Sequence, residues 1–447
     1  MSTALEASGQ ASAEYTSQTE SGALSSIGKG SENNLPDNTP AAEKSAEVVP
    51  AVEAGATDDQ ITGLYDTQMK KLRTLAMLCL SDSFGGLEMN TVRLARWLKD
   101  LKLFDVTVIG LEKSPAVQMA QEAGLPVACT KSYAKYVDIR GSYRLRKMLR
   151  AMGAEIVFTA NNRDLPLLSA LKNIWRSPVK VVYQQQMDLV INKKDIIHTL
   201  RFSAVDLWIA PLESIKHDAL RHTRVKASKI KVIPLGIEVE PLLAGKKDRL
   251  SAQKQLGLKP EHPLIGIMGR IDRLKGQLVL LQALQILREK NIFAALLIAG
   301  EPTRNTGQGY TEEVQNFVRA SRLEDAVHFC PFTRDVATFY SAVDVFVMAS
   351  KRETYGMVTA EAMLFGLPVV GSNAGGTVGL LSLYDGYLLF EPENANDLAD
   401  KLQQILENPE EYKAKALQAS VRVKRYFSNV EECKDIQAAI EALMAKR

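Results

Sequence analysis

Two glutamates and two cations carry the clearest chemical signal in the sequence. Glu361 lies in the middle of the apolar segment Met357 to Phe365, and Glu353 lies eight positions upstream in a loop. A buried carboxylate is costly unless the groups around it donate hydrogen bonds. Glu361 is therefore either a core carboxylate satisfied by backbone donors or a carboxylate that accepts from the hydroxyls of a ligand.

The two cations lie in "MGRIDRLKGQ" (268–277), which follows the apolar run "PLIGI" and opens an apolar helical pattern. Arg270 falls at the end of the expected strand, and Lys275 falls at the start of the expected helix. Free N–H groups, the helix dipole and two cations would converge there on an anion. The alternative is an exposed basic loop that pairs with local acids such as Asp272. The segment is neither a Walker A nor a GxGxxG pattern, so it does not imply an ordinary nucleotide-binding fold.

A nucleotide sugar would satisfy all four side chains. Its diphosphate complements Arg270 and Lys275, its ribose hydroxyls complement Glu361, and its sugar hydroxyls complement Glu353. The loop after Glu353 could add backbone N–H donors, at Thr354, Tyr355 and Gly356. No short DxD motif and no metal-ligand spacing of histidines is present. We therefore expect no cofactor and no metal, with the two cations neutralising the diphosphate.

The elements that must position these residues alternate between apolar runs and helical patterns after residue 70. Six runs precede residue 240: "RTLAMLCLSD", "DVTVIGL", "AEIVFTAN", "VKVVYQQQ", "VDLWIAPL" and "IKVIPLG". Six follow it: "PLIGIMGR", "FAALLIAG", "VHFCPF", "VDVFVMAS", "LPVVGSN" and "GYLLFEP". Most are continuously apolar, which is typical of strands covered on both faces. The pattern predicts an α/β protein with two doubly wound parallel sheets. We expect residues 67–240 to bind the acceptor and residues 241–447 to bind the donor, with the last helix free to pack back on the first domain. A ligand would lie in the cleft between the domains, at the carboxyl ends of both sheets.

Charge is unevenly divided along the chain. Residues 1–66 hold eleven acids against Lys29 and Lys44, which gives this segment a net charge of −9. Because the whole chain has a net charge of +3, the remaining residues carry +12. The leading segment is poor in aromatic residues and is predicted to be disordered. No apolar stretch is long enough to span a membrane, and no signal pattern is present, so a cytoplasmic location is expected. No aromatic-interleaved basic array indicates nucleic acid as a partner.

The order of the motifs resembles glycosyltransferase family 4, of the GT-B fold. "GR" and "KG" around Arg270 and Lys275, the two glutamates of "ETYGMVTAEAMLFGLPVV" and the following "GG" occur in that order, and the likeness extends over roughly residues 73–430. The resemblance implies two facing Rossmann-like domains and transfer, with retention, from an activated sugar. It implies catalytic roles for Arg270, Lys275 and Glu353. It implies donor contacts by Gly85, Gly86, Arg270, Lys275, Thr333, Glu353, Thr354, Tyr355, Gly356, Met357 and Glu361.

Two positions depart from the family pattern. Gly379 stands where relatives often carry a glutamate, and the run Gln184 to Gln186 lies near the place of a histidine in many relatives. A glutamine can position hydroxyls but cannot take a proton, which puts a histidine-like role in doubt.

The acceptor side is less defined. Asn161, Gln185 and Gln186 are hypotheses for acceptor hydroxyls, with solvated loop residues as the alternative. One expected helix carries a cluster of cations, at Arg140, Arg144, Arg146, Lys147 and Arg150. This helix either touches anionic lipid or is an ordinary amphipathic helix with a solvated basic face.

The sequence thus predicts a cytoplasmic glycosyltransferase, with peripheral contact to the inner face of a membrane left open. It would move a hexose from a UDP- or GDP-linked donor to a glycan or lipid-linked acceptor, as in polysaccharide or lipopolysaccharide biosynthesis. One alternative is another GT-B enzyme, an epimerase or a sugar-phosphate synthase. Another is a non-catalytic sugar-nucleotide-binding scaffold tethered through residues 1–66.

Overall fold

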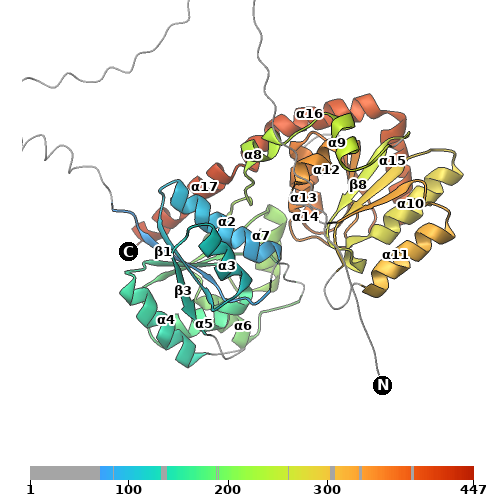
Figure 1. Ribbon diagram of the computed structural model, residues 1–447. Helices are drawn as coiled ribbons and strands as arrows, with labels where there is room; N and C mark the ends of the chain where they lie inside the picture. Colours follow the sequence, from blue (N-terminus) through green and yellow to red (C-terminus); the bar gives the residue numbers. More distant parts are fainter. Residues whose placement is uncertain are drawn as a thin grey trace, which may run out of the picture. The chain divides into compact units, whose positions relative to one another are not determined.

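The computed structural model describes residues 71–83, 85–131, 138–187, 189, 191–259, 261–302, 308–331, 335–383 and 387–446. The segment 1–66, which the sequence predicts to be disordered, lies outside these residues. Lys70–Arg447 forms one unit by its contacts, and this unit contains two parallel sheets (Figure 1).

The first sheet has the strand order β3-β2-β1-β4-β5-β6-β7. Its strands are β1 (Thr74–Cys79), β2 (Asp105–Leu111), β3 (Val127–Thr130), β4 (Ile156–Thr159), β5 (Lys180–Gln184), β6 (Leu207–Ala210) and β7 (Ile230–Val232). Its helices are α2 (Gly86–Asp100), α3 (Pro115–Glu122), α4 (Ile139–Ala151), α5 (Leu165–Asn173), α6 (Ile196–Ser203) and α7 (Glu213–His222). The pairs α2 and α3, α4 and α5, and α5 and α6 each pack together, and α2 lies across the sheet from α5 (Figure 1).

Six of these seven strands are those that the sequence predicts. The prediction missed β3, which is a four-residue strand at the edge of the sheet with only Thr130 fully buried. A strand at the edge of a sheet that is largely uncovered lacks the continuous apolar run by which the other strands were predicted.

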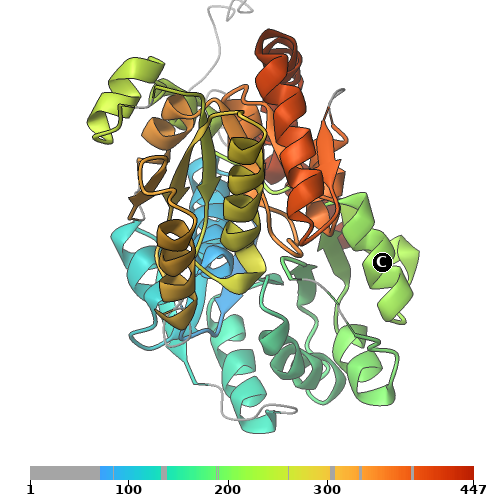
Figure 2. The same ribbon diagram turned by 90° about the vertical axis from the view of Figure 1, so that its right-hand side faces the viewer.

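The second sheet has the order β10-β9-β8-β11-β12-β13, and all six of its strands were predicted. They are β8 (Leu264–Met268), β9 (Ala295–Ala299), β10 (Val327–Cys330), β11 (Val345–Met348), β12 (Val369–Ser372) and β13 (Leu388–Phe390). The helices associated with it are α9 (Arg249–Gln255), α10 (Gln277–Glu289), α11 (Gln308–Ala320), α12 (Val336–Ala342), α13 (Met357–Leu364), α14 (Gly376–Leu381), α15 (Ala395–Glu407) and α16 (Pro409–Tyr426). In Figure 2, α10 and α11 lie in front of the strands. Two parallel α/β sheets of this kind confirm the predicted fold class.

The last helix, α17 (Asn429–Ala445), belongs to the core of the first sheet. It packs against α2 and β6, and it buries Cys433, Ile436 and Ile440 among the side chains of β1 and α2. Backbone hydrogen bonds join the start of this helix to the segment that follows β7, because Ile237 N donates to Phe427 O and Asn429 N donates to Ile237 O. The short helix α8 (Val239–Ala244) then leads toward the second sheet.

A buried carboxyl group fixes this crossing. Glu432 accepts from Gln184 Nε2 at 2.8 Å and from the backbone N–H of Gly236 at 2.8 Å. Burial raises the pKa of Glu432 to about 7 against the opposing effect of these two donors. A second buried acid, Asp164, accepts from Thr159 Oγ1 at 2.9 Å, and burial raises its pKa to about 7 as well.

These two acids predict that stability falls as the pH rises from about 5 to 7. Each folded pKa of about 7 lies above the ordinary values of 3.8 for Asp164 and 4.5 for Glu432. Between those values the folded chain holds protons that the unfolded chain has released, so the free energy of unfolding drops by up to about 1.4 kcal/mol per pH unit and group. Urea unfolding at several pH values measures the slope. Glu432→Gln should flatten it and the neighbouring Glu431→Gln should not; an unchanged slope in Glu432→Gln would contradict the assignment.

Candidate active site

The loop between β8 and α10 presents the two predicted cations. Asp272 accepts from Leu274 N at 2.9 Å and so shapes a short 3-10 turn, Arg273–Lys275, before α10 begins. Gly276 has a φ of 75°, and a Cβ there would lie 2.2 Å from the carbonyl oxygen of Ala349. Only glycine permits this approach, which presses the start of α10 against the loop that follows the neighbouring strand β11.

Arg270 and Lys275 differ in their partners. The Arg270 side chain is exposed and makes no hydrogen bond or ion pair with any residue that the structure describes. Lys275 Nζ instead lies 2.5 Å from Glu353 Oε2, with 26% of the lysine and 19% of the glutamate side chain exposed. Two of the predicted site residues therefore meet directly, although 78 positions separate them in sequence.

The paired glycines of the motif hold the Glu353 loop. Gly375 has a φ of 59°, and a Cβ there would lie 2.2 Å from Glu353 O. A Cβ on Gly376 would lie 2.1 Å from Thr354 O, and Gly376 N donates to Glu353 O at 2.7 Å. The two glycines thus fix the backbone that carries the Glu353 carboxylate.

The rest of this loop combines a buried anchor with backbone N–H groups. Tyr355 is buried, and its hydroxyl donates to Leu235 O at 3.3 Å. Gly356, at a φ of 88°, then starts α13, whose first residue is the partly buried Met357. Within the described part of the chain, the backbone N–H groups of Thr354, Tyr355 and Gly356 have no acceptor. Their assignment to a ligand stays a prediction.

Glu361 accepts a hydrogen bond from a tyrosine side chain, whereas the sequence suggested backbone donors or a ligand. The hydroxyl of Tyr340 donates to Glu361 Oε2 at 2.8 Å, from a side chain buried in edge-on contact with Phe339 and tilted contact with Phe346. Burial raises the pKa of Glu361, while the Tyr340 hydroxyl and the positive charge of Arg93 oppose that rise. The Oε1 atom accepts from no described residue. Among the described residues, Glu361 is therefore held by a tyrosine and not by backbone donors, and its contact with a ligand stays a prediction.

In the first sheet, Gly85 precedes α2 and Gly86 begins it. A Cβ on the exposed Gly86 would meet no described atom within 4 Å, and the predicted contact of these glycines with the donor stays a prediction. Glu88 lies buried beneath this turn and accepts from Ser81 Oγ at 2.6 Å. Thr333, the remaining predicted donor contact, lies outside the described residues.

The glutamine run is structural in large part. Gln184 and Gln185 are fully buried. Gln185 accepts from Trp208 Nε1 at 3.0 Å and donates to Met187 O at 3.0 Å, so the structure does not support the predicted acceptor contact at Gln185. Gln186 is partly exposed and donates to Gln184 Oε1 at 2.9 Å.

The other acceptor candidate, Asn161, begins a turn after β4. Its Oδ1 accepts from Arg163 N at 3.0 Å, whereas its amide nitrogen donates to no described residue. Gly379, where relatives often carry a glutamate, packs with its Cα close to Leu212, since a Cβ there would lie 3.3 Å from Leu212 Cδ1. A larger side chain at this position would have to displace that contact.

Among the described residues, no group of three or more His, Cys, Asp or Glu side chains is arranged to hold a metal ion. The described helices also include none that is both long and apolar enough to cross a membrane.

Two parallel α/β sheets in one chain are the architecture of the GT-B class. Two family models match the chain: "Glycosyl transferases group 1" over residues 248–420 and "Glycosyltransferase Family 4" over residues 84–241. Together they cover about three quarters of the chain. The chain belongs to glycosyltransferase family 4.

Curated relatives agree with this assignment. D-inositol 3-phosphate glycosyltransferase of Corynebacterium urealyticum is 29% identical over 204 residues, which are 44% of this chain and 48% of that protein. The enzyme of the same name from Actinosynnema mirum is 31% identical over 186 residues, 40% of this chain and 43% of the relative. The chain thus spans about half the length of the curated relatives it matches.

Among solved structures, a glycosyltransferase from Rickettsia africae has a TM-score of 0.74 at 18% identity, with 84% of this chain and all of that one covered. HepE of Anabaena in complex with UDP has a TM-score of 0.71 at 20% identity, with 83% and 100% covered. At these identities the likeness shows the fold alone.

Proposed function

We propose that this protein transfers a hexose from a nucleotide sugar to a hydroxyl group of a glycan or glycolipid, with retention of configuration. The observation that carries the proposal is the cluster at the start of α10 and α13. The loops and helices that follow the neighbouring strands β8 and β11 carry the Lys275–Glu353 ion pair, Arg270 and Glu361. Among the described residues, the Arg270 side chain has no partner and Glu361 accepts from a side chain through one oxygen only. HepE of Anabaena, which shares the fold, binds UDP and glucose together in its crystal structure, and this supports a UDP-linked donor.

The chemistry follows from charge. Breaking the glycosidic bond of the donor leaves negative charge on the departing diphosphate. Arg270 and Lys275, with the N–H groups at the start of α10, would stabilise this charge. Glu353 is engaged with Lys275, so we assign it to the sugar hydroxyls and not to a covalent nucleophile. With two cations on the diphosphate, transfer would need no metal ion.

The acceptor and the location form the less specific part of the proposal. Asn161 remains a candidate for acceptor hydroxyls because its amide nitrogen donates to no described residue. Gln186 remains a candidate because its side chain is partly exposed. The name of the curated relatives makes a phosphorylated inositol a second acceptor candidate beside a glycan or glycolipid. We place the protein in the cytoplasm.

The test is a thermal-shift panel of UDP, GDP, ADP and their sugars. A ligand at one hundred times its dissociation constant stabilises the folded state by about 2.7 kcal/mol, which raises the midpoint by several degrees. We expect one nucleotide family to raise the wild-type midpoint, with or without EDTA. Glu361→Ala should abolish the shift, and Tyr340→Phe should reduce it, because the carboxylate loses its orienting donor.

Glu410→Ala, which removes an exposed glutamate at the start of α16, serves as the matched control and should shift as the wild type does. If no nucleotide or nucleotide sugar raises the wild-type midpoint, the donor proposal fails. If the shift survives Glu361→Ala unchanged, the assignment of the ribose to this carboxylate fails.

A further inference from the structure

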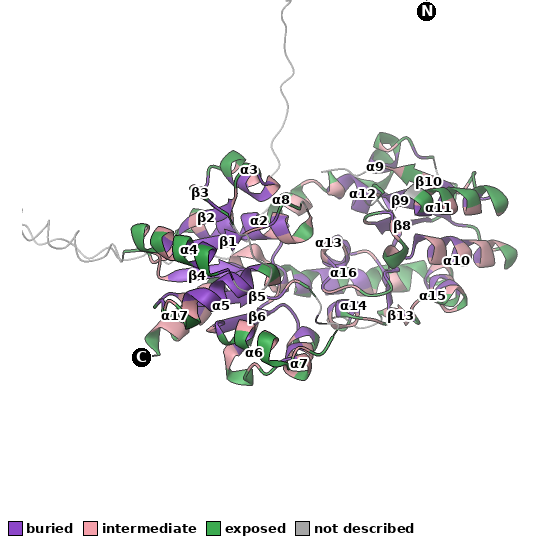
Figure 3. Ribbon diagram, turned by 90° about the horizontal axis from the view of Figure 1, so that it is seen from below, coloured by how far each residue is buried: buried purple, intermediate pink, exposed green. Residues whose placement is uncertain are grey.

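Helix α6 exposes large aliphatic side chains of the kind that are ordinarily buried in a folded protein. Ile196 is 86% exposed, Ile197 60% and Leu200 50%, and Ile191 just before the helix is 63% exposed. Phe202 is the one fully buried residue of α6. Figure 3 shows this helix in a mixture of the exposed and intermediate colours. We call Ile191, Ile196, Ile197 and Leu200 the α6 patch. Clustered exposed apolar side chains of this kind mark interaction surfaces.

Basic residues surround the α6 patch. Arg224 Nε donates to Lys194 O at 2.8 Å, and Lys193 N donates to His222 O at 2.8 Å, so the segments 191–203 and 221–229 lie together. These segments contain seven cations, Lys193, Lys194, Arg201, Arg221, Arg224, Lys226 and Lys229. Their single acid, Asp195, accepts from His198 N at 3.0 Å at the start of α6. Four of these cations, Lys194, Arg221, Arg224 and Lys226, are exposed, so the two segments carry an exposed positive charge.

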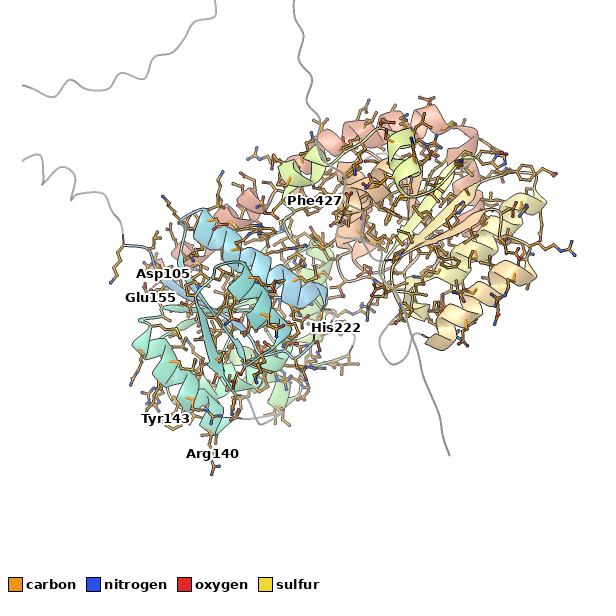
Figure 4. The ribbon with its side chains drawn as sticks, in the orientation of Figure 1. Asp105, Arg140, Tyr143, Glu155, His222 and Phe427 are labelled. Atoms are coloured by element: carbon orange, nitrogen blue, oxygen red, sulfur yellow. The ribbon has the colours of Figure 1, made fainter. Side chains whose placement is uncertain are left out.

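Helix α4, where the sequence places the basic cluster, contributes charge but no comparable aliphatic patch. Its Leu145 and Leu149 are buried in the core, whereas Arg144, Lys147 and Arg150 are exposed. Figure 4 shows Arg140 and Tyr143 at the outer side of this helix. Both α4 and α6 pack against α5. The cations of α4 therefore widen the positive surface, and the apolar side chains that could insert into another phase come mainly from α6.

We propose that the α6 patch docks on an anionic membrane surface, with Ile196 and Ile197 inserted among the lipids and the surrounding cations at the headgroups. Exposed aliphatic residues beside Lys and Arg are the combination by which peripheral helices bind anionic lipid. A second copy of the chain is disfavoured because the seven cations of each copy would repel those of the other. An acidic polypeptide would pair with the cations but would leave the isoleucines exposed. The docking surface involves none of the residues assigned to the donor, so it stands apart from the proposed reaction.

Vesicle flotation of the full-length protein tests the proposal. The wild type should bind phosphatidylcholine vesicles that contain about one third phosphatidylglycerol, bind plain phosphatidylcholine much less, and be released by salt. Ile196→Ser with Ile197→Ser should weaken binding at least tenfold without changing charge. Lys194→Glu with Arg224→Glu should weaken it at least as much, since each cation contributes about fivefold.

The matched control is Leu250→Ser, which removes an aliphatic side chain that is 72% exposed on α9 and should leave binding unchanged. All three variants change exposed residues, and an unaltered thermal midpoint confirms that each has folded. Wild-type protein that fails to bind anionic vesicles overturns the proposal, as does a double isoleucine variant that binds like the wild type. Sedimentation that shows a dimer lost in the isoleucine variant would assign the patch to a second copy instead. The assay contains neither donor nor acceptor, so its failure leaves the proposed transferase activity standing.

Discussion

Replacing Lys275 by alanine should lower kcat about 10²–10³-fold, the usual cost of removing one electrostatic donor from a developing charge. The side chain would contact the departing diphosphate, and its present partner, Glu353, lies only 2.5 Å away. Donor binding must therefore compete with an existing ion pair, and loss of Lys275 also leaves Glu353 without its cation. Since the pair is partly exposed, its loss should change stability by only about 1 kcal/mol. The measurement is the steady-state rate with the nucleotide sugar that gives the largest thermal shift.

Arg273→Ala is the matched control for this prediction. Arg273 lies on the same turn, but it pairs with Glu313 and covers the ring of Tyr310 at 5.3 Å. Its loss should change kcat only a few-fold. A Lys275→Ala protein that retains more than about a tenth of wild-type kcat would refute the assigned role. Glu353→Ala should also lose turnover, and a scaffold without catalysis would show no turnover in any variant.

Gly375→Ala should lower both stability and activity. The new Cβ would lie 2.2 Å from Glu353 O, at a φ of 59° and a ψ of −140°. Backbone strain and the clash together should reduce the free energy of unfolding by about 2–5 kcal/mol. Because the clash is with the backbone of Glu353, the surviving folded protein should also turn over about 10²-fold more slowly. Urea unfolding and steady-state rates measure the two effects.

Gly124→Ala separates strain from clash. Gly124 has a φ of 67°, but a Cβ there would meet nothing within 4 Å, so only the cost of about 1–2 kcal/mol for a left-handed residue applies. Its distance from the site should leave kcat unchanged. Equal destabilisation by the two alanines would show that the loop around Glu353 yields easily, contrary to the prediction.

The sequence predicted the fold because strands covered on both faces appear as continuous apolar runs. It also placed Arg270 and Lys275 at a strand end and Glu361 on a helix, since those positions follow from local pattern. It could not show that Lys275 contacts Glu353 or that Tyr340 supplies the donor for Glu361, because these contacts join loops and helices that are distant in sequence. Local pattern carries no record of which helices become neighbours.

The α6 patch and Gln185 both show that local sequence does not determine which side chains are buried. The helix α6 contains enough apolar residues to be read as core-facing, yet it buries only Phe202 and exposes both isoleucines. Gln185 is a polar residue after an apolar run, which favours a solvent-facing position, yet Trp208 Nε1 donates to it inside the core. Burial depends on what packs against a residue, and in both cases the packing partner is distant in sequence.

The return of α17 to the first sheet has a consequence for synthesis on the ribosome. Cys433, Ile436 and Ile440 complete a core whose other members come from the first half of the chain. At about 5–20 residues per second, the interval between emergence of Gly236 and of Ile440 is on the order of ten to forty seconds. During that time the nascent first domain exposes the apolar surface on β1 and α2 that α17 covers in the folded protein. Residues of α17 are thus required by a domain that is translated well before them, and a chain truncated before α17 should have a destabilised first sheet.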